Sequence, residues 1–205
     1  MTQPPHRVKV QMPLQTEAQA RLRLELRKHL LQLRRETSLS IRQTWDLQIA
    51  THLRQQIEAL SPRSVGIYWP IKAEPNLQAC FQQLHADGVQ LALPIVTGPA
   101  QALKFVSWAP EDAMDEDAYG IPIPRERALA IQPDLLVIPC VGFNPQNFRL
   151  GYGGGFYDRT LAAMPDVNTI GVAYQISFID FPPDKYDLPL TQIITELDIV
   201  TRSTE

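Results

Sequence analysis

The sequence has little cysteine, no excess of positive charge and no long apolar run. Its two cysteines, Cys80 and Cys140, lack Cys-x-x-Cys spacing, so they indicate neither a zinc site nor a disulfide framework and fit a reducing compartment. The formal net charge of −3 argues against a dedicated nucleic-acid-binding protein, which needs a dominant basic face. Because no apolar run is long enough to cross a bilayer and residues 1–13 carry no apolar export signal, we expect a cytoplasmic protein without a membrane anchor.

The length of 205 residues suits one folded domain with a substantial core. Three prolines near the start disfavour a regular helix, so we predict a flexible leader over residues 1–15 and a single α/β domain over residues 16–205. Leucines then recur at helical spacing and predict an amphipathic helix from Thr16 to about Ser38. Ser40 and Gln43 have the form of a capping box, which predicts a second helix over residues 41–60.

Short apolar runs bounded by proline and glycine follow, and they predict strands over residues 65–69, 89–93, 103–106, 135–138 and 169–173. Several are apolar at consecutive positions, as expected where helices cover both faces of a parallel sheet. Residues 77–87, with Asn76 as N-cap, and residues 157–164 are the predicted crossover helices. The fold class is therefore α/β: a three-layer, doubly wound, mostly parallel sheet with helices on both faces.

Ligands of such sheets bind beyond the carboxyl ends of the strands, where residues 70–76 and 140–155 form loops. The second loop packs Gly151, Gly153, Gly154 and Gly155 into five positions. Bare backbone there could turn its N–H groups toward an anion, with the N-terminus of a helix starting near Phe156 behind it.

Neither a P-loop ending nor the G-x-G-x-x-G spacing is present, and a tight strand-to-helix turn would also explain the glycines. The neighbouring charges favour a nucleotide. Arg149 and Arg159 can pair with phosphate oxygens, and Asp158 can hold a magnesium ion.

Residues 149–159, together with Gly142 and Phe143, closely resemble the signature of the 5-formyltetrahydrofolate cyclo-ligase (methenyltetrahydrofolate synthetase) family. The likeness extends over most of the chain, through residues 26–28, 67–70, 120–122, 187–190 and 193–196. It implies a fold like that of sugar-phosphate isomerases and CoA-transferases. It also implies that 5-formyltetrahydrofolate is cyclised to 5,10-methenyltetrahydrofolate with Mg²⁺ and ATP, through a phosphorylated formyl group, with release of ADP and phosphate.

The resemblance also implies roles for individual residues. The catalytic residues would be Arg149, Tyr157 and Asp158, and the metal ligands Asp158 and Asp187. ATP would be bound by Arg23, Arg27, Arg149, Leu150, Gly151, Tyr152, Gly153, Gly154, Gly155, Phe156 and Tyr157. The folate would be bound by Ile71, Glu74, Asn76, Tyr119, Tyr152, Gly153, Gly154, Gly155 and Phe156. Relatives often carry Arg or Lys where this chain has Tyr152 and Gly154.

Each of these roles has a simpler alternative. Arg23 and Arg27 could form a solvated basic stripe, Glu74 could be an ordinary surface glutamate, Asn76 could only cap a helix, and Tyr119 could fill the core. Three other functions also compete: a relative that binds nucleotide or folate without turnover, an isomerase or CoA-transferase, and a hydrolase. The hydrolase is disfavoured because the sequence has no G-x-S-x-G elbow. We expect a monomer that binds ATP and 5-formyltetrahydrofolate, with or without a polyglutamate tail, and neither nucleic acid nor membrane.

Overall fold

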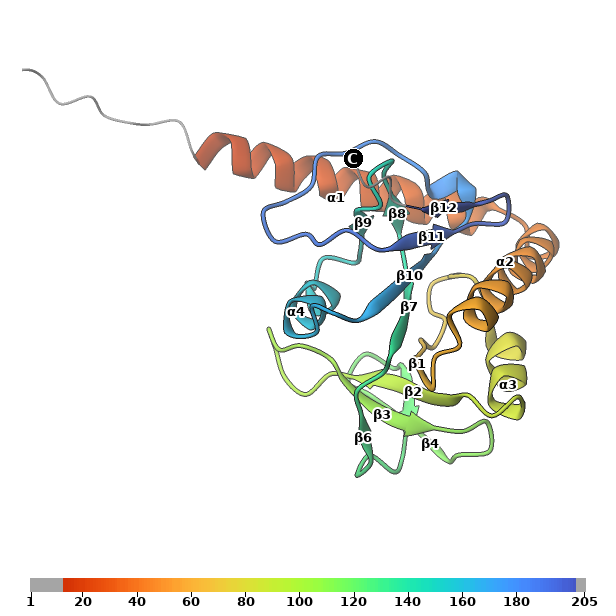
Figure 1. Ribbon diagram of the computed structural model, residues 1–205. Coiled ribbons are helices and arrows are strands. Elements are labelled where there is room, and N and C mark those ends of the chain that lie inside the picture. Colours follow the sequence, from red (N-terminus) through yellow and green to blue (C-terminus); the bar gives the residue numbers. More distant parts are fainter. Residues whose placement is uncertain (1–12, 202–205) are drawn as a thin grey trace, which may run out of the picture.

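The computed structural model describes residues 13–201 of the chain (Figure 1). The helices are α1 (Pro13–Glu36), α2 (Leu39–Leu60), α3 (Gln78–Ala86) and α4 (Phe156–Ala163), with a short 3-10 helix η1 (Gln175–Ser177). The strands are β1 (Ser64–Gly66), β2 (Gln90–Ile95), β3 (Lys104–Trp108), β4 (Met114–Glu116), β5 (Pro122–Pro124), β6 (Ala130–Ile131), β7 (Leu135–Pro139), β8 (Gly142–Phe143), β9 (Arg149–Leu150), β10 (Asn168–Val172), β11 (Gln192–Ile194) and β12 (Ile199–Thr201).

The central sheet has eight strands in the order β12-β11-β10-β7-β1-β2-β3-β6. The pairs from β11 to β2 are parallel, whereas β3 and β12 run in the opposite direction at the two sides. Strand β3 is antiparallel because the segment after β2 is too short for a crossover helix. The predicted α/β fold with a mostly parallel sheet is confirmed.

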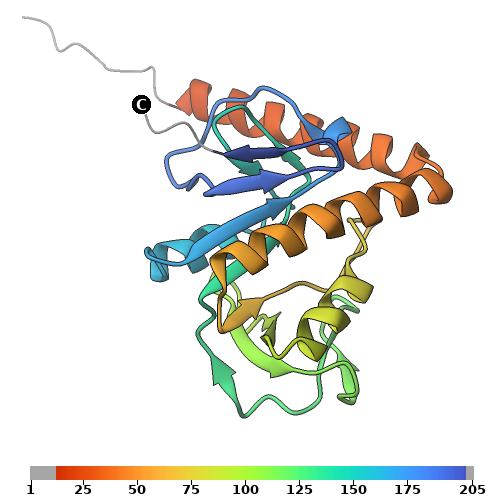
Figure 2. The same ribbon diagram turned by 45° about the vertical axis from the view of Figure 1, so that its right-hand side comes forward.

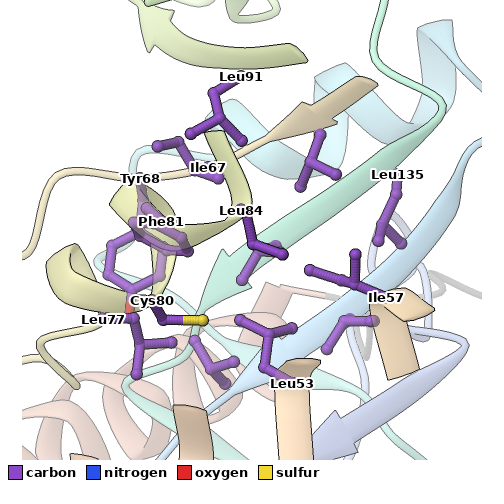
Figure 3. Close-up of a cluster of buried hydrophobic side chains, with 14 of the residues drawn as sticks. Leu53, Ile57, Ile67, Tyr68, Leu77, Cys80, Phe81, Leu84, Leu91 and Leu135 are labelled. Carbon is purple, nitrogen blue, oxygen red and sulfur yellow. The ribbon is translucent and has the colours of Figure 1, made fainter. Parts of the chain in front are cut away.

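Helices cover both faces of this sheet. In Figure 1, α2 and α3 lie on one side of β7 and α4 lies on the other, and Figure 2 shows α2 crossing the face of the strands. The first face is sealed by a cluster in which Leu53 and Ile57 of α2 meet Phe81 of α3 and the strand residues Leu91 and Leu135 (Figure 3). On the opposite face, the buried cluster contains residues of α4 and of β3, β7 and β11. Alternate residues of the buried strands therefore contribute to the two clusters.

The predicted loop after β7 contains a hairpin that the sequence analysis missed. Strands β8 and β9 pair antiparallel, and their connection is closed by Asn144, whose Oδ1 accepts hydrogen bonds from the backbone N–H groups of Gln146 and Phe148. Helix α1 packs on this hairpin, because Leu30 shares a buried cluster with Val141 and Leu150. The N-terminal helix is thus placed against the segment that leads into the glycines.

Two predicted helix starts were wrong. Helix α1 begins at Pro13, three residues before the predicted start, since proline at the first helical position loses no needed N–H. The remaining part of the predicted leader, residues 1–12, lies outside the described residues. Helix α2 is capped by Ser38, whose Oγ accepts from the Ile41 N–H at 3.4 Å, so the capping box at Ser40 does not form. No helix within residues 13–201 combines the length and the apolar character needed to span a membrane.

The packing of α2 on the sheet predicts how two substitutions on this helix change the free energy of unfolding. Leu53 is 0% exposed, so Leu53→Ala should lower the free energy of unfolding by about 2–5 kcal/mol through lost burial and a residual cavity. Leu47 on the same helix is 71% exposed, and Leu47→Ala should change the free energy of unfolding by less than about 0.5 kcal/mol. Urea denaturation of both variants measures the difference, and equal losses would contradict the assigned packing face.

Candidate functional site

The glycine segment lies between β9 and α4, near the carboxyl ends of the parallel strands. Gly153 has φ +97° and Gly155 has φ +65°, in the left-handed region that glycine adopts without strain. Gly155 is the N-cap of α4 and offers no side chain to cap it, so the first N–H groups of the helix have no side-chain cap there. Asp158 lies in the first turn, where a carboxylate interacts favourably with the helix dipole.

Arg27 of α1 contacts this segment, whereas Arg23 on the same helix contacts residues 182 and 187. The Arg27 Nε donates to the Gly151 carbonyl at 2.7 Å, and its guanidinium lies beside the position that a Cβ on Gly153 would occupy. Arg23 is buried and pairs with Asp187 at 2.8 Å. Burial lowers the pKa of Arg27, and the positive charge of Arg23 lowers it further. Two guanidiniums close enough to repel each other form a site that an anion would stabilise.

Arg149 belongs to β9, the strand that leads into the glycine segment. It is buried, its NH2 donates to the Asp158 carboxylate at 2.5 Å, and its NH1 donates to the Leu188 carbonyl at 3.3 Å. Its guanidinium also lies 5.9 Å from the ring centroid of Tyr157. Burial raises the pKa of the Tyr157 hydroxyl, and the charge of Glu74 raises it further. The Tyr157 phenol therefore stays protonated between a guanidinium and a carboxyl group.

Glu74 connects the first loop to the glycines. It is 3% exposed, its Oε1 accepts from the Tyr152 hydroxyl at 2.8 Å, and its Oε2 accepts from the Ile71 N–H at 2.9 Å. Burial raises its pKa from 4.5 to about 7, although both hydrogen bonds act in the opposite direction. The alternative of an ordinary surface glutamate does not describe this residue, since its carboxylate joins two loops in the interior.

The turn that carries Glu74 has an unusual backbone. The Glu74 N–H donates to the Ile71 carbonyl at 2.9 Å, and the two residues between them, Lys72 and Ala73, have φ of +47° and +57°. Left-handed backbone at a residue with a Cβ costs about 1–3 kcal/mol and tends to persist where surrounding contacts enforce it. The Ile71 N–H bond and the position of Lys72 Nζ, 4.9 Å from the Tyr152 ring centroid, are two such contacts.

Arg34 is a site residue that the sequence analysis missed. It is 0% exposed, its NH2 donates to the Cys140 carbonyl at 2.6 Å, and its NH1 lies 3.5 Å from the Tyr152 hydroxyl. Its Nε has no hydrogen-bond partner in the described part of the chain. One signal was available, because Arg34 follows Leu30 by four residues and so falls on the apolar face of α1.

Several predicted residues lie away from this cluster or serve other contacts. Tyr119 is 69% exposed in the turn between β4 and β5, so it does not fill the core. Asn76 is not the N-cap of α3 as predicted, because Leu77 holds that position; the Asn76 Oδ1 instead accepts from the Gln78 N–H at 3.2 Å in the turn just before the helix. The Leu150 side chain points into a hydrophobic cluster, which leaves its backbone alone for ligand contact. Arg159 donates to the Gly154 carbonyl at 2.8 Å, a hydrogen bond that holds the glycine loop to α4.

The two predicted metal ligands are each paired with an arginine, Asp158 with Arg149 and Asp187 with Arg23. Within residues 13–201 no group of three or more His, Cys, Asp or Glu side chains forms a cage for a metal ion. Carboxylate oxygens are a ligand type that Mg²⁺ accepts, and the ion usually keeps several waters and takes further ligands from a bound phosphate.

Comparison with known proteins identifies the same family over nearly the whole chain. The model of the 5-formyltetrahydrofolate cyclo-ligase family matches residues 16–196. A 5-formyltetrahydrofolate cyclo-ligase of Haemophilus influenzae is 29% identical over 189 residues, which cover 88% of this chain and 99% of that protein. That of Escherichia coli is 27% identical over 172 residues, which cover 80% and 94%.

Solved structures agree with this result. The 5,10-methenyltetrahydrofolate synthetase of Aquifex aeolicus has a TM-score of 0.75 at 29% identity, covering 90% of this chain and 96% of its own. The corresponding synthetase of Mycoplasma pneumoniae has a TM-score of 0.69 at 28% identity, covering 85% and 98%. A family match of this length, with the same fold in two relatives, places the chain in the 5-formyltetrahydrofolate cyclo-ligase family, and the protein is a ligase.

Proposed function

We propose that the protein cyclises 5-formyltetrahydrofolate to 5,10-methenyltetrahydrofolate in an ATP- and Mg²⁺-dependent reaction that releases ADP and phosphate. Membership of the family supports the reaction. The observation that carries it for this chain is the ion pair between the buried Arg149 and the partly exposed Asp158, beside the bare glycine loop. A guanidinium, a carboxylate and free helix N–H groups at one point suit a transferring phosphoryl group.

The chemical problem is that a formamide is a poor electrophile. The formyl oxygen would attack the γ-phosphorus of ATP, forming an O–P bond while the bond from phosphorus to the ADP oxygen breaks. The folate nitrogen at position 10 would then add to the activated formyl carbon and lose its proton. Cleavage of the carbon–oxygen bond finally expels phosphate and leaves the methenyl bridge. Positioning and charge neutralisation account for most of the catalysis of such a transfer.

Two arginines and the loop would supply that neutralisation. Arg27 contacts Gly151, and Arg149 pairs with Asp158 in the first turn of α4, so their guanidiniums could contact the β- and γ-phosphates together. The Tyr157 phenol, beside Arg149, could donate a hydrogen bond to the formyl or phosphoryl oxygen. Arg23 would contribute its positive charge, which acts on the neighbouring Arg27.

Asp158 and Asp187 are the residues that would hold Mg²⁺, and the ion would neutralise charge on the β- and γ-phosphates. In the structure both carboxylates are occupied by Arg149 and Arg23. Entry of a magnesium nucleotide would therefore exchange partners: the carboxylates turn to the metal and the arginines to the phosphates. This exchange favours binding of the metal and the nucleotide together rather than separately.

The folate would lie on the side of Glu74. An ionised Glu74 could accept two hydrogen bonds from the amino group and ring N–H of the pterin, with Ile71 and Asn76 beside it. Tyr119 would contribute only if its exposed turn closed over the ligand. We further propose that the protein is a cytoplasmic monomer that accepts folates with or without a polyglutamate tail.

The proposed reaction is tested by mixing the purified protein with 5-formyltetrahydrofolate, ATP and Mg²⁺ and following methenyltetrahydrofolate absorbance together with ADP. Both products should appear in equal amounts. Arg149→Ala, which removes the guanidinium from the transferring phosphate, should lower kcat/KM at least about 100-fold. If ATP binds but absorbance never rises, the protein is a non-catalytic relative. If product forms without ADP, the phosphorylation step is wrong.

The proposed metal position predicts a change in magnesium dependence. Asp158→Asn should raise the Mg²⁺ concentration that gives half-maximal activity by about tenfold or more, because it removes a charged ligand. Asp166→Asn is the matched control on the surface after α4 and should leave the titration unchanged. A magnesium titration of Asp158→Asn that coincides with the parent curve would show that the ion is held elsewhere.

The buried Glu74 carboxyl predicts a pH dependence of stability. Its pKa is about 7 in the folded protein and 4.5 when exposed, so the folded state binds the extra proton between these values. The stabilisation is therefore complete below about pH 4.5 and is lost as pH rises through 7, by about 3 kcal/mol in all.

Glu74→Gln should remove this slope, which urea denaturation at pH 5, 6, 7 and 8 would measure against the parent. Glutamine can still accept from the Ile71 N–H and can donate to the Tyr152 hydroxyl. Glu58→Gln, at an exposed position of α2, is the matched control and should keep the parent slope. Parallel curves for the parent and Glu74→Gln would mean that the Glu74 carboxyl stays ionised in the folded protein.

A further inference from the structure

The two proposed binding loops are tied together at one side chain. Tyr152 belongs to the glycine segment, yet its hydroxyl donates to the Glu74 Oε1 at 2.8 Å. Its ring also lies under the ammonium group of Lys72, with Nζ 4.9 Å from the ring centroid. The hydroxyl and the ring thus contact two residues of the same four-residue turn, which follows β1 on a distant part of the chain.

That turn is held in a strained conformation. Lys72 and Ala73 both have left-handed backbone that side-chain-bearing residues rarely adopt, and one of the bonds that close the turn comes from the Glu74 carboxylate itself. The other oxygen of this carboxylate is held by Tyr152. Loss of the Tyr152 contact would leave a buried acceptor without its donor and weaken the hold on a strained segment.

Glu74 is not available to a ligand in this arrangement. Its side chain is nearly inaccessible, and each carboxylate oxygen already accepts a hydrogen bond from the protein. The Tyr152 ring, by contrast, is partly exposed and forms the outer layer. A pterin can reach the carboxylate once Tyr152 has turned away. Tyr152 lies between Gly151 and Gly153, so a shift of the glycine loop would carry its hydroxyl away from Glu74.

We propose that Tyr152 is a positioning residue that couples the two substrates, so that nucleotide bound on the glycine loop and folate bound at Glu74 each release the same Tyr152–Glu74 contact. The proposal rests on the proposed function, because it takes the glycine loop as the nucleotide site and Glu74 as the folate contact. Whichever ligand binds first breaks the contact, and the second then binds to a site already open. Binding is therefore positively cooperative, and by linkage the effect is reciprocal.

The experiment measures the Kd of 5-formyltetrahydrofolate by isothermal titration calorimetry, with and without a saturating, non-hydrolysable ATP analogue and Mg²⁺. In the parent protein the analogue should tighten folate binding at least about fivefold. In Tyr152→Phe, which keeps the ring but removes the donor, folate alone should bind more tightly than to the parent. In this variant, the Kd of folate measured without the analogue should differ from the Kd measured with it by no more than about twofold, so that the ratio of the two Kd values is close to one.

Tyr174→Phe is the matched control. It also removes a tyrosine–carboxylate hydrogen bond, that from Tyr174 to Asp46 at 2.7 Å, but this bond does not join the two loops. It should keep the parent ratio, and thermal melting of both variants verifies that they are folded.

The possible outcomes separate the coupling from the function. If the ratio in Tyr152→Phe equals that of the parent, or if Tyr152→Phe binds folate alone more weakly, Tyr152 is not the coupling element. If both ligands bind the parent without affecting each other, the coupling is wrong while the proposed function stands. If the parent binds neither folate nor nucleotide, the proposed function itself fails and the coupling fails with it.

Discussion

Four arginines, three on α1 and one on β9, lose much of their contact with water, and each needs a compensating partner because burying a charge is costly. Arg149 pairs with Asp158, Arg23 pairs with Asp187, and Arg27 and Arg34 donate to backbone carbonyls. These contacts tie α1, the β8–β9 hairpin and the segment before β11 to one another. The same contacts that hold the fold together at this end of the sheet therefore hold the charges that the site needs.

The proposed exchange of partners would distinguish this site from a purely structural ion-pair network. A carboxylate that neutralises an arginine can instead bind a divalent cation, and the arginine can then bind phosphate. In the proposed coupling, Glu74 would likewise exchange its partner for a ligand, although its partner is the neutral Tyr152 hydroxyl and not a guanidinium. Burial raises the pKa of Glu74 most strongly, while the positive charges of the buried Arg34 and of Lys72 lower it.

Much of the architecture followed from local patterns. Consecutive apolar residues identified β1, β2, β7 and β10, because a strand buried on both faces is apolar at successive positions. The leucine spacing identified α1 as an amphipathic helix, although Leu22 of that pattern is 44% exposed. The β8–β9 hairpin left no such trace. Its strands are two residues long and form only because α1 packs on them and Asn144 closes the turn.

At the site, the sequence by itself determined the residue types: the glycines, Arg149, Asp158 and the two arginines one helical turn apart on α1. These could be read locally because bare backbone, charge and helical spacing are properties of short segments. Only the tertiary structure decided that Arg34 is buried behind Tyr152 and that Glu74 is held from a loop 78 residues away in the sequence. Such contacts depend on how the parallel strands align their ends, and that alignment is set by the packing of the whole sheet.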